Sequence, residues 1–196
     1  MTTPLNLVYN KYNKKLKPLV SEIEGRLEKF EEPLLMNLMA QFDYVALSIL
    51  EDDSNKQRLY LQQALSHLDI AVTNSYQYLV YALAKKNNIF KKRCGGEKGI
   101  AKLSDGKYIG KYKSLDKKGK ANVRKGLTME DCDAGVYFKE AYECYIEQET
   151  ILEKLAIVSI TRKKSSKSCI IIRGLFSIII SIIAGCIVNT WLNGML

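Results

Sequence analysis

The sequence predicts an all-α protein, with a bundle of three to four long helices followed by one C-terminal transmembrane helix. Two observations lead to this prediction. Apolar residues recur at intervals of three and four over most of residues 1–90 and again after residue 128, which is the spacing of one helix face. Residues 174–192 then carry no charge over 19 positions, a length that spans a bilayer core of about 30 Å as a helix.

Residues 1–90 are predicted to form an N-terminal bundle of three helices. The apolar stripe of the first helix is interrupted by Pro18, so that helix either kinks there or starts there. Pro33 opens the second helix, for which the pattern predicts a core face made of Leu35, Leu38, Met39, Phe42, Val45, Ala46 and Ile49. Ser54 followed by Gln57 has the spacing of a capping box and starts the third helix, which runs to about Phe90.

The helical pattern stops in residues 91–127, a basic insertion rich in glycine and lysine. Asp105-Gly106 with its flanking residues has the form of a two-residue β-turn, so the alternatives here are a small β-hairpin over 100–112 or an irregular loop. Thr128 and Asp131 then predict the cap of a fourth helix within residues 128–168. Its stripe steps by three and four through Phe138, Ala141, Tyr145, Gln148, Leu152, Leu155 and Ser159.

Residues 169–196 are predicted to anchor the chain in a membrane. Five basic residues precede the uncharged span and none follows it, so the positive-inside rule places residues 1–168 in the cytoplasm and the C-terminus on the opposite side. Small and polar residues recur every four positions along one face of the span, and such a stripe favours helix association within the membrane. These residues are Ser177, Ser181, Gly185 and Asn189. The alternatives are a dry helix contact, a pore lined by this stripe, or a chance spacing.

Positive charge is concentrated in one part of the chain. Residues 85–126 hold 15 Lys and Arg against three acidic residues, a net charge of +12, whereas residues 127–160 hold two against eight, a net charge of −6. The basic residues interleave with tyrosines and are candidates for binding a nucleic acid, a nucleotide or anionic lipid. The candidates are Lys91, Lys92, Arg93, Lys107, Tyr108, Lys111, Tyr112, Lys113, Lys117, Lys118, Lys120, Arg124 and Lys125. The alternative is a solvated loop.

No catalytic constellation is evident, and we expect no metal and no cofactor. His67 is the sole histidine, the cysteines form no CxxC pair, and the glycines match neither nucleotide-binding fingerprint. A membrane-bound nuclease of the HEPN type would need an Arg-x4–6-His motif, which is missing. Glu140, Glu143 and Glu147 share a helix face, which is either a solvated acidic surface or one that opposes the basic segment.

Three N-terminal helices, a linker, a heptad helix containing Gln148 and a C-terminal anchor resemble the order of elements in a syntaxin-type SNARE, although the heptad stripe is shorter. This resemblance implies a membrane-tethered adaptor or scaffold. The residues themselves predict a non-enzymatic, tail-anchored sensor or effector that self-associates and presents a basic surface to an anionic partner, with the helical bundle as a surface for a protein partner. The architecture resembles that of small membrane effectors of bacterial stress or antiviral defence, and this resemblance implies that assembly perturbs the membrane.

Overall fold

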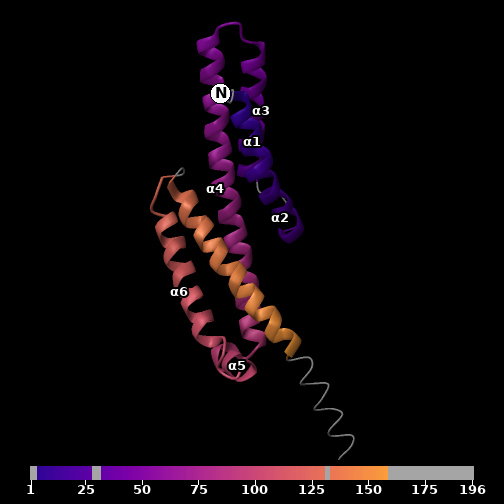
Figure 1. Ribbon diagram of the computed structural model, residues 1–196, viewed down its shortest axis with the longest axis vertical. Coiled ribbons are helices and arrows are strands. Elements are labelled where there is room, and N and C mark those ends of the chain that lie inside the picture. The colour runs from indigo at the N-terminus through magenta and orange to yellow at the C-terminus, as the bar shows by residue number, and fades with distance from the viewer. Residues whose placement is uncertain (1–3, 28–31, 131–132, 159–196) are drawn as a thin grey trace, which may run out of the picture. The chain divides into compact units, whose positions relative to one another are not determined.

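The computed structural model describes residues 4–27, 32–130 and 133–158, and all regular secondary structure within these ranges is helical. The predicted all-α class and the helical bundle are therefore confirmed for this part of the chain (Figure 1). The chain divides into two compact units, Met1–Leu152 and Glu153–Leu196. The predicted transmembrane helix over 169–196 lies outside the described residues.

The longest helix among the described residues, α4 (Ser54–Arg93), is the element on which the N-terminal helices pack. Its 40 residues extend for about 60 Å at 1.5 Å per residue. The side chain of Asp53 caps it by accepting a hydrogen bond of 2.8 Å from the amide of Asn55. The cap therefore lies one residue before the predicted Ser54, and Gln57 donates to the carbonyl of Glu51 instead of completing a capping box.

The first predicted helix is continuous through Pro18. It comprises α1 (Pro4–Lys11), a π-helical turn η1 (Tyr12–Leu16) and α2 (Lys17–Leu27). The amide of Lys17 donates to the carbonyl of Tyr12, five residues back. Because proline has no amide proton and clashes with the carbonyl four residues before it, a local π turn lets the helix pass this point. The sequence predicts either a helix start or a kink at Pro18, and the structure has a π turn there instead.

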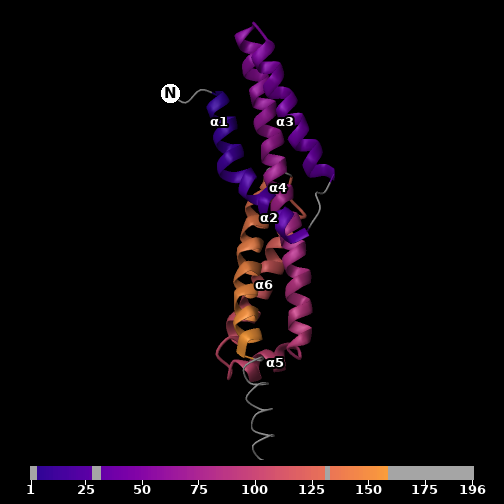
Figure 2. The same cartoon turned by 90° about the vertical axis from the view of Figure 1, so that its right-hand side faces the viewer.

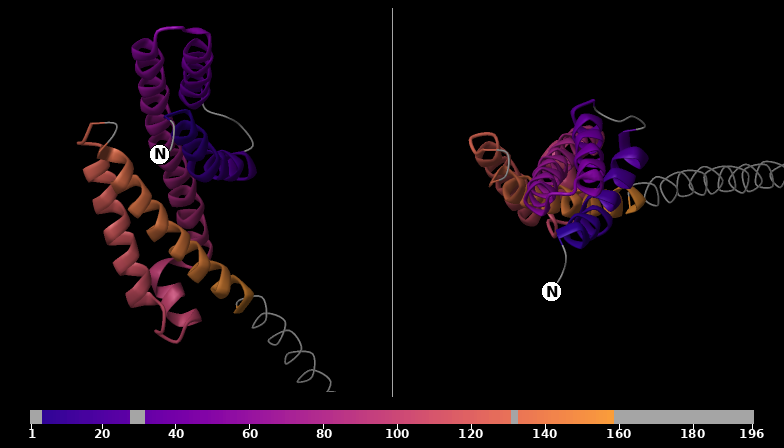
Figure 3. Two further views of the ribbon diagram at one scale, coloured as in Figure 1. Left: turned by 45° about the horizontal axis from the view of Figure 1, so that its top comes forward. Right: turned by 90° about the horizontal axis from the view of Figure 1, so that it is seen from above.

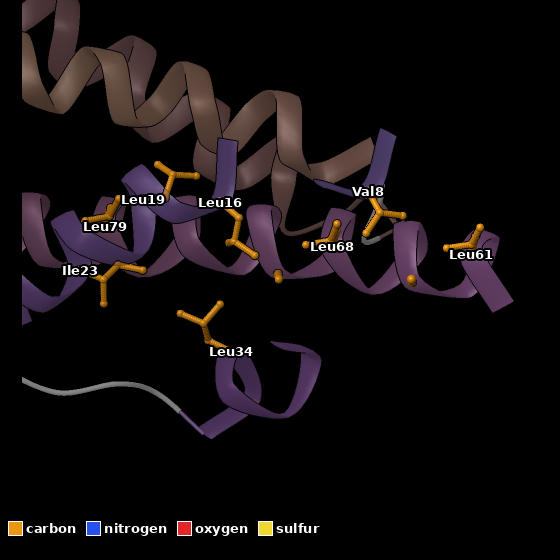
Figure 4. Close-up of a cluster of buried hydrophobic side chains, with 10 residues drawn as sticks. Val8, Leu16, Leu19, Ile23, Leu34, Leu61, Leu68 and Leu79 are labelled. Carbon is orange, nitrogen blue, oxygen red and sulfur yellow. The ribbon is translucent and has the colours of Figure 1, made fainter. Parts of the chain in front are cut away.

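The core of the N-terminal half lies between these helices and α4 (Figure 4). Its buried apolar side chains come from α1, η1, α2 and α4, with one, Leu34, from α3 (Glu32–Leu50). The larger side chains are Val8, Leu16, Leu19, Ile23, Leu34, Leu61, Leu68 and Leu79, and Ala64 and Ala71 of α4 complete the cluster. Burial of each such aliphatic side chain contributes about 1.5–3 kcal/mol, so this cluster fixes the first three helical segments against α4.

The core face predicted for the second helix, α3 (Glu32–Leu50), is wrong for five of its seven residues, whereas Leu38 and Val45 do pack against the core. Leu34, Gln41 and Ser48 are its buried residues, whereas most of the predicted core face points outward, including Leu35, Met39, Phe42, Ala46 and Ile49. Polar contacts hold α3 in this orientation on α4. His67 Nδ1 lies 3.0 Å from Asn37 Oδ1, and the His67 ring stacks on Tyr44 with centroids 5.4 Å apart.

The predicted β-hairpin at 100–112 and the irregular insertion at 91–127 are also wrong, because the segment is helical. It forms α5 (Gly96–Leu103) and α6 (Ile109–Gly126). Asp105 and Gly106 do form a tight turn, with φ of 49° and 82°, but the turn joins two helices. At the other end of α5, Gly95 and Gly96 have φ of 84° and 71°, a backbone region that glycine adopts without steric cost.

The last described helix covers residues 133–158, and its part within the first unit packs beside α6 and the C-terminal half of α4 (Figures 2 and 3). Its predicted apolar stripe is buried from Phe138 through Leu152. The predicted cap is not at Thr128, whose hydroxyl donates to the carbonyl of Lys125 at the end of α6. Asp131 lies outside the described residues.

Candidate anion-binding surface

Helix α6 lies close against the helix of residues 133–158 because glycines occupy its contact face. The buried positions of α6 are Tyr112, Gly119, Asn122 and Gly126. A Cβ added at Gly119 would lie 3.1 Å from Tyr145 Cζ, and one added at Gly126 would lie 3.0 Å from Phe138 Cε2. Only a residue without a side chain lets the aromatic rings of the second helix approach so closely. The glycines therefore set the spacing of this helix pair.

Polar side chains fix the register of the pair. Gln148, which is 1% exposed, donates to the Tyr112 carbonyl at 3.2 Å. Asn122 donates to Glu140 at 3.0 Å, and Lys111 forms an ion pair with Glu147. The acidic face predicted from Glu140 and Glu147 thus opposes the basic segment within the same chain. Because satisfied buried polar groups resist slippage, these contacts hold α6 in one orientation.

The opposite face of α6 is basic and exposed. The helix contains seven Lys and Arg and one acidic residue, Asp116. Two of the cations on this face are paired: Lys113 with Glu97 at 3.1 Å and Lys120 with Asp116 at 2.6 Å. Lys125 lies over the Tyr137 ring at 5.6 Å. In the part of the chain that the structure describes, Lys117, Lys118 and Arg124 form no ion pair, so they are available to an anion.

The remaining basic candidates lie at the two ends of α5. Lys91, Lys92 and Arg93 form the last turn of α4, and Lys91 pairs with Glu97 at 2.9 Å. Hydrogen bonds from Lys91 and Lys113 lower the pKa of Glu97 below its ordinary value. These ion pairs join α4, α5 and α6, so part of the predicted basic set has a structural role.

The two tyrosines of the predicted site are not displayed for base stacking. Tyr112 is 2% exposed, and burial raises its pKa to about 12. Tyr108 is half-buried beneath Lys107, whose Nζ lies 5.6 Å from the ring centroid. Recognition through stacking needs an accessible aromatic face. The surface therefore offers cationic groups without the aromatic component that the sequence suggested.

A pocket of about 380 Å³ lies beside the basic face, between α4, α6 and the helix of residues 133–158. Lys91, Tyr112 and Lys120 of the predicted set line it. Sequence reasoning did not place its other polar residues here, which are Lys85, Asn87, Asn88, Asp116, Tyr145 and Gln148. Asn87 donates to the Tyr145 carbonyl at 2.8 Å, which shows the pocket floor to be part of the helix packing. The available signal was the polar run at 85–88 of α4, in which Asn87 is buried.

Among the described residues, no group of three or more His, Cys, Asp or Glu side chains could hold a metal ion. The predicted membrane-association stripe, Ser177, Ser181, Gly185 and Asn189, lies outside the described residues. Within them, α3 is the one helix that is long and apolar enough to cross a membrane by length and composition. Comparisons with protein-family models, with curated proteins and with solved structures found no match for this chain.

Proposed function

We propose that this chain is a non-enzymatic, tail-anchored membrane protein whose α6 surface binds anionic lipid headgroups, and whose anchors associate with one another. The observation that carries the proposal is the basic face of α6. Lys117, Lys118 and Arg124 lie within eight residues, lack acidic partners among the described residues, and belong to a helix held by glycine packing. Because the helix backbone that carries these cations is already ordered, binding to a charged surface orders only their side chains.

Anionic lipid is favoured over nucleic acid for two reasons. The surface has cations but no freely displayed aromatic ring, so it is suited to phosphate groups rather than to bases. A protein with the predicted anchor also remains within reach of headgroups. Each Lys or Arg near an anionic membrane contributes about 1 kcal/mol, so the three unpaired cations supply about 3 kcal/mol, or about a hundredfold in affinity.

The test uses the full chain reconstituted in neutral phosphatidylcholine vesicles. These vesicles are mixed with labelled phosphatidylserine vesicles or with labelled duplex RNA, and capture is measured across a salt series. We expect capture of the anionic vesicles, with steep loss at high salt. Replacing Lys117, Lys118 and Arg124 with Gln should weaken that capture by about a hundredfold.

The matched control replaces Lys14, Lys15 and Lys17 with Gln, three exposed lysines outside α6 that change the net charge by the same amount. Capture should survive in this control. Equal loss in both variants would show that net charge alone is responsible and would overturn the assignment to α6. Preferential capture of RNA would replace lipid with nucleic acid as the partner.

The proposed role of the anchor is tested separately. Ser181→Leu together with Gly185→Leu fills the small-residue stripe, which should abolish anchor association and any dye leakage caused by the full chain. Leakage unchanged by this double substitution would contradict membrane perturbation through anchor assembly. Vesicle capture by α6 should be unaffected, because the substitutions leave the basic face intact.

A further inference from the structure

Helix α3 exposes an apolar surface that its own bundle covers only at Phe42, whose ring meets the edge of Tyr12 with centroids 5.9 Å apart. Five of its residues step by four and three along the outward side, and two more flank them. The outward stripe, called the α3 seam below, is Leu35, Met39, Phe42, Ala46 and Ile49, with Met36 and Leu50 beside it. Figure 2 shows α4 along the other side of this helix. The polar residues Gln41 and Ser48 are buried on that side together with Leu34, so the inner side of α3 is the more polar of the two.

The spacing of the α3 seam is that of a helix-pairing surface. Alternating steps of four and three correspond to the a and d positions of a heptad, which meet the same positions of a second helix. A small apolar hollow of about 130 Å³ lies beside the seam, between Phe42 and the α1 residues Leu5 and Tyr9. The α3 seam thus has protruding methionine side chains and, beside them, a hollow of side-chain size. In a self-complementary contact the side chains of one copy enter the hollow of the other.

The exposed apolar area of this face is similar to the area that one protein contributes to a stable interface. Among the large residues of this face, Met36, Met39, Ile49 and Leu50 are each more than 60% exposed, and Leu35 and Phe42 are about half exposed. Together they present on the order of 800 Å² per copy, which is the contribution of one side to a standard protein interface. Monomeric proteins rarely leave an apolar patch of this extent uncovered.

The charges of α3 argue against a lipid surface as the covering partner. Helices that lie in a membrane interface carry Lys and Arg on their flanks, which contact anionic headgroups. Helix α3 contains no Lys or Arg; its charged residues are Glu32 and Asp43, and the turn after it is Glu51-Asp52-Asp53. Anionic headgroups would repel this end of the bundle, and a partner without a continuous negative surface meets less repulsion there.

We propose that the α3 seam binds the α3 seam of a second copy of this chain. The contact is a two-helix pairing that joins the cytoplasmic units independently of the anchor. It deepens the self-association in the proposed function, and copies held in one membrane would meet at high effective concentration. In this pairing the outward methionines and Phe42 contact the second copy and no longer contact water.

The test is photo-crosslinking of the full chain in phosphatidylcholine vesicles without other proteins. Benzoylphenylalanine replaces Met39 in one sample and Val136, an exposed residue outside α3, in the other. We expect a covalent dimer from position 39 whose adduct maps to residues 32–50 of the second copy, and little from position 136. Mainly lipid adducts at position 39 would establish the membrane as the occupant, and equal dimer from both positions would show random collision. Either result overturns the proposal.

A second pair of variants excludes misfolding as an explanation. Met39→Glu with Ile49→Glu places carboxylates on the seam, and Leu127→Glu with Val136→Glu does so at equally exposed apolar positions elsewhere. With the crosslinker at Phe42, the seam variant should lose about tenfold or more of the dimer and the control should keep it, with unchanged helical circular dichroism. Retention of the dimer in the seam variant overturns the proposal. Phosphatidylserine-vesicle capture, measured on the same samples, reports the α6 function separately.

Discussion

Replacing Gly119 and Gly126 with Ala should destabilise the helix pair that presents the basic face. The added methyl groups would lie 3.0–3.3 Å from ring carbons of Phe138 and Tyr145, closer than the optimum of about 3.5–4.0 Å. Overpacking of this kind costs about 1–3 kcal/mol per site, and the better helix propensity of Ala returns up to about 1 kcal/mol. We therefore expect the double variant to lose about 2 kcal/mol of unfolding free energy, or about 4–8 °C in Tm.

The assay is thermal unfolding of the full chain followed by far-ultraviolet circular dichroism. The matched control replaces Gly25 and Gly110 with Ala, since a Cβ at either position meets no heavy atom within 4 Å. This control gains helix propensity without overpacking, so its Tm should rise. If Gly119→Ala with Gly126→Ala melts as high as the control, α6 does not pack as closely as the structure describes, and the explanation of its glycines fails.

Other contacts give predictions for single substitutions. Glu149 Oε1 lies 3.1 Å from the Arg26 guanidinium. Burial acts to raise the pKa of Glu149, but its cationic partners outweigh burial and lower the pKa below its ordinary value. The ionised carboxylate therefore stabilises the fold above about pH 4.3, and that stabilisation is lost as pH falls through the lowered pKa. Glu149→Gln should therefore cost about 2 kcal/mol at pH 7 in urea unfolding, with no difference from the parent at pH 2. Gly99→Ala would place Cβ 1.6 Å from the Cys94 carbonyl oxygen, so we expect more than about 3 kcal/mol of destabilisation or loss of the α5 turn in hydrogen exchange. Asp53→Ala should cost about 1 kcal/mol in thermal unfolding by removing the α4 cap, and an unchanged Tm would refute that assignment.

The sequence predicts the helices of the N-terminal half because their apolar residues follow the helical period without interruption. The start of α4 is predicted to within one residue, since Asp53 and Ser54 are both good cap residues and local chemistry does not separate them. The π turn before Pro18 is beyond such reasoning. It depends on packing that keeps η1 and α2 on α4 despite the lost hydrogen bond.

In the basic segment glycine has two roles, which the sequence alone does not distinguish. Gly95, Gly96 and Gly106 have positive φ and interrupt helices, as expected from a turn-forming residue. Gly119 and Gly126 instead lie seven residues apart on one face with Tyr112, and they let another helix approach. That spacing was visible in the sequence, but its meaning depends on the aromatic residues of a helix more than ten residues further along. The sequence therefore predicts which basic residues make up the site but not how the helices arrange them.

The error in α3 has a different cause and leads to the strongest experiment. Periodicity identifies an apolar face but not what covers it, because burial in the chain's own core and burial by a partner leave the same pattern. In this helix the intramolecular side carries the buried Leu34, the contact of Asn37 with His67 and the small Ser48, and the more apolar side is left outside. If the α3 seam pairs with a second copy, the sequence prediction identified the right residues as buried and the wrong molecule as burying them. A photo-crosslink from Met39 to residues 32–50 of another copy decides between that outcome and an uncovered surface.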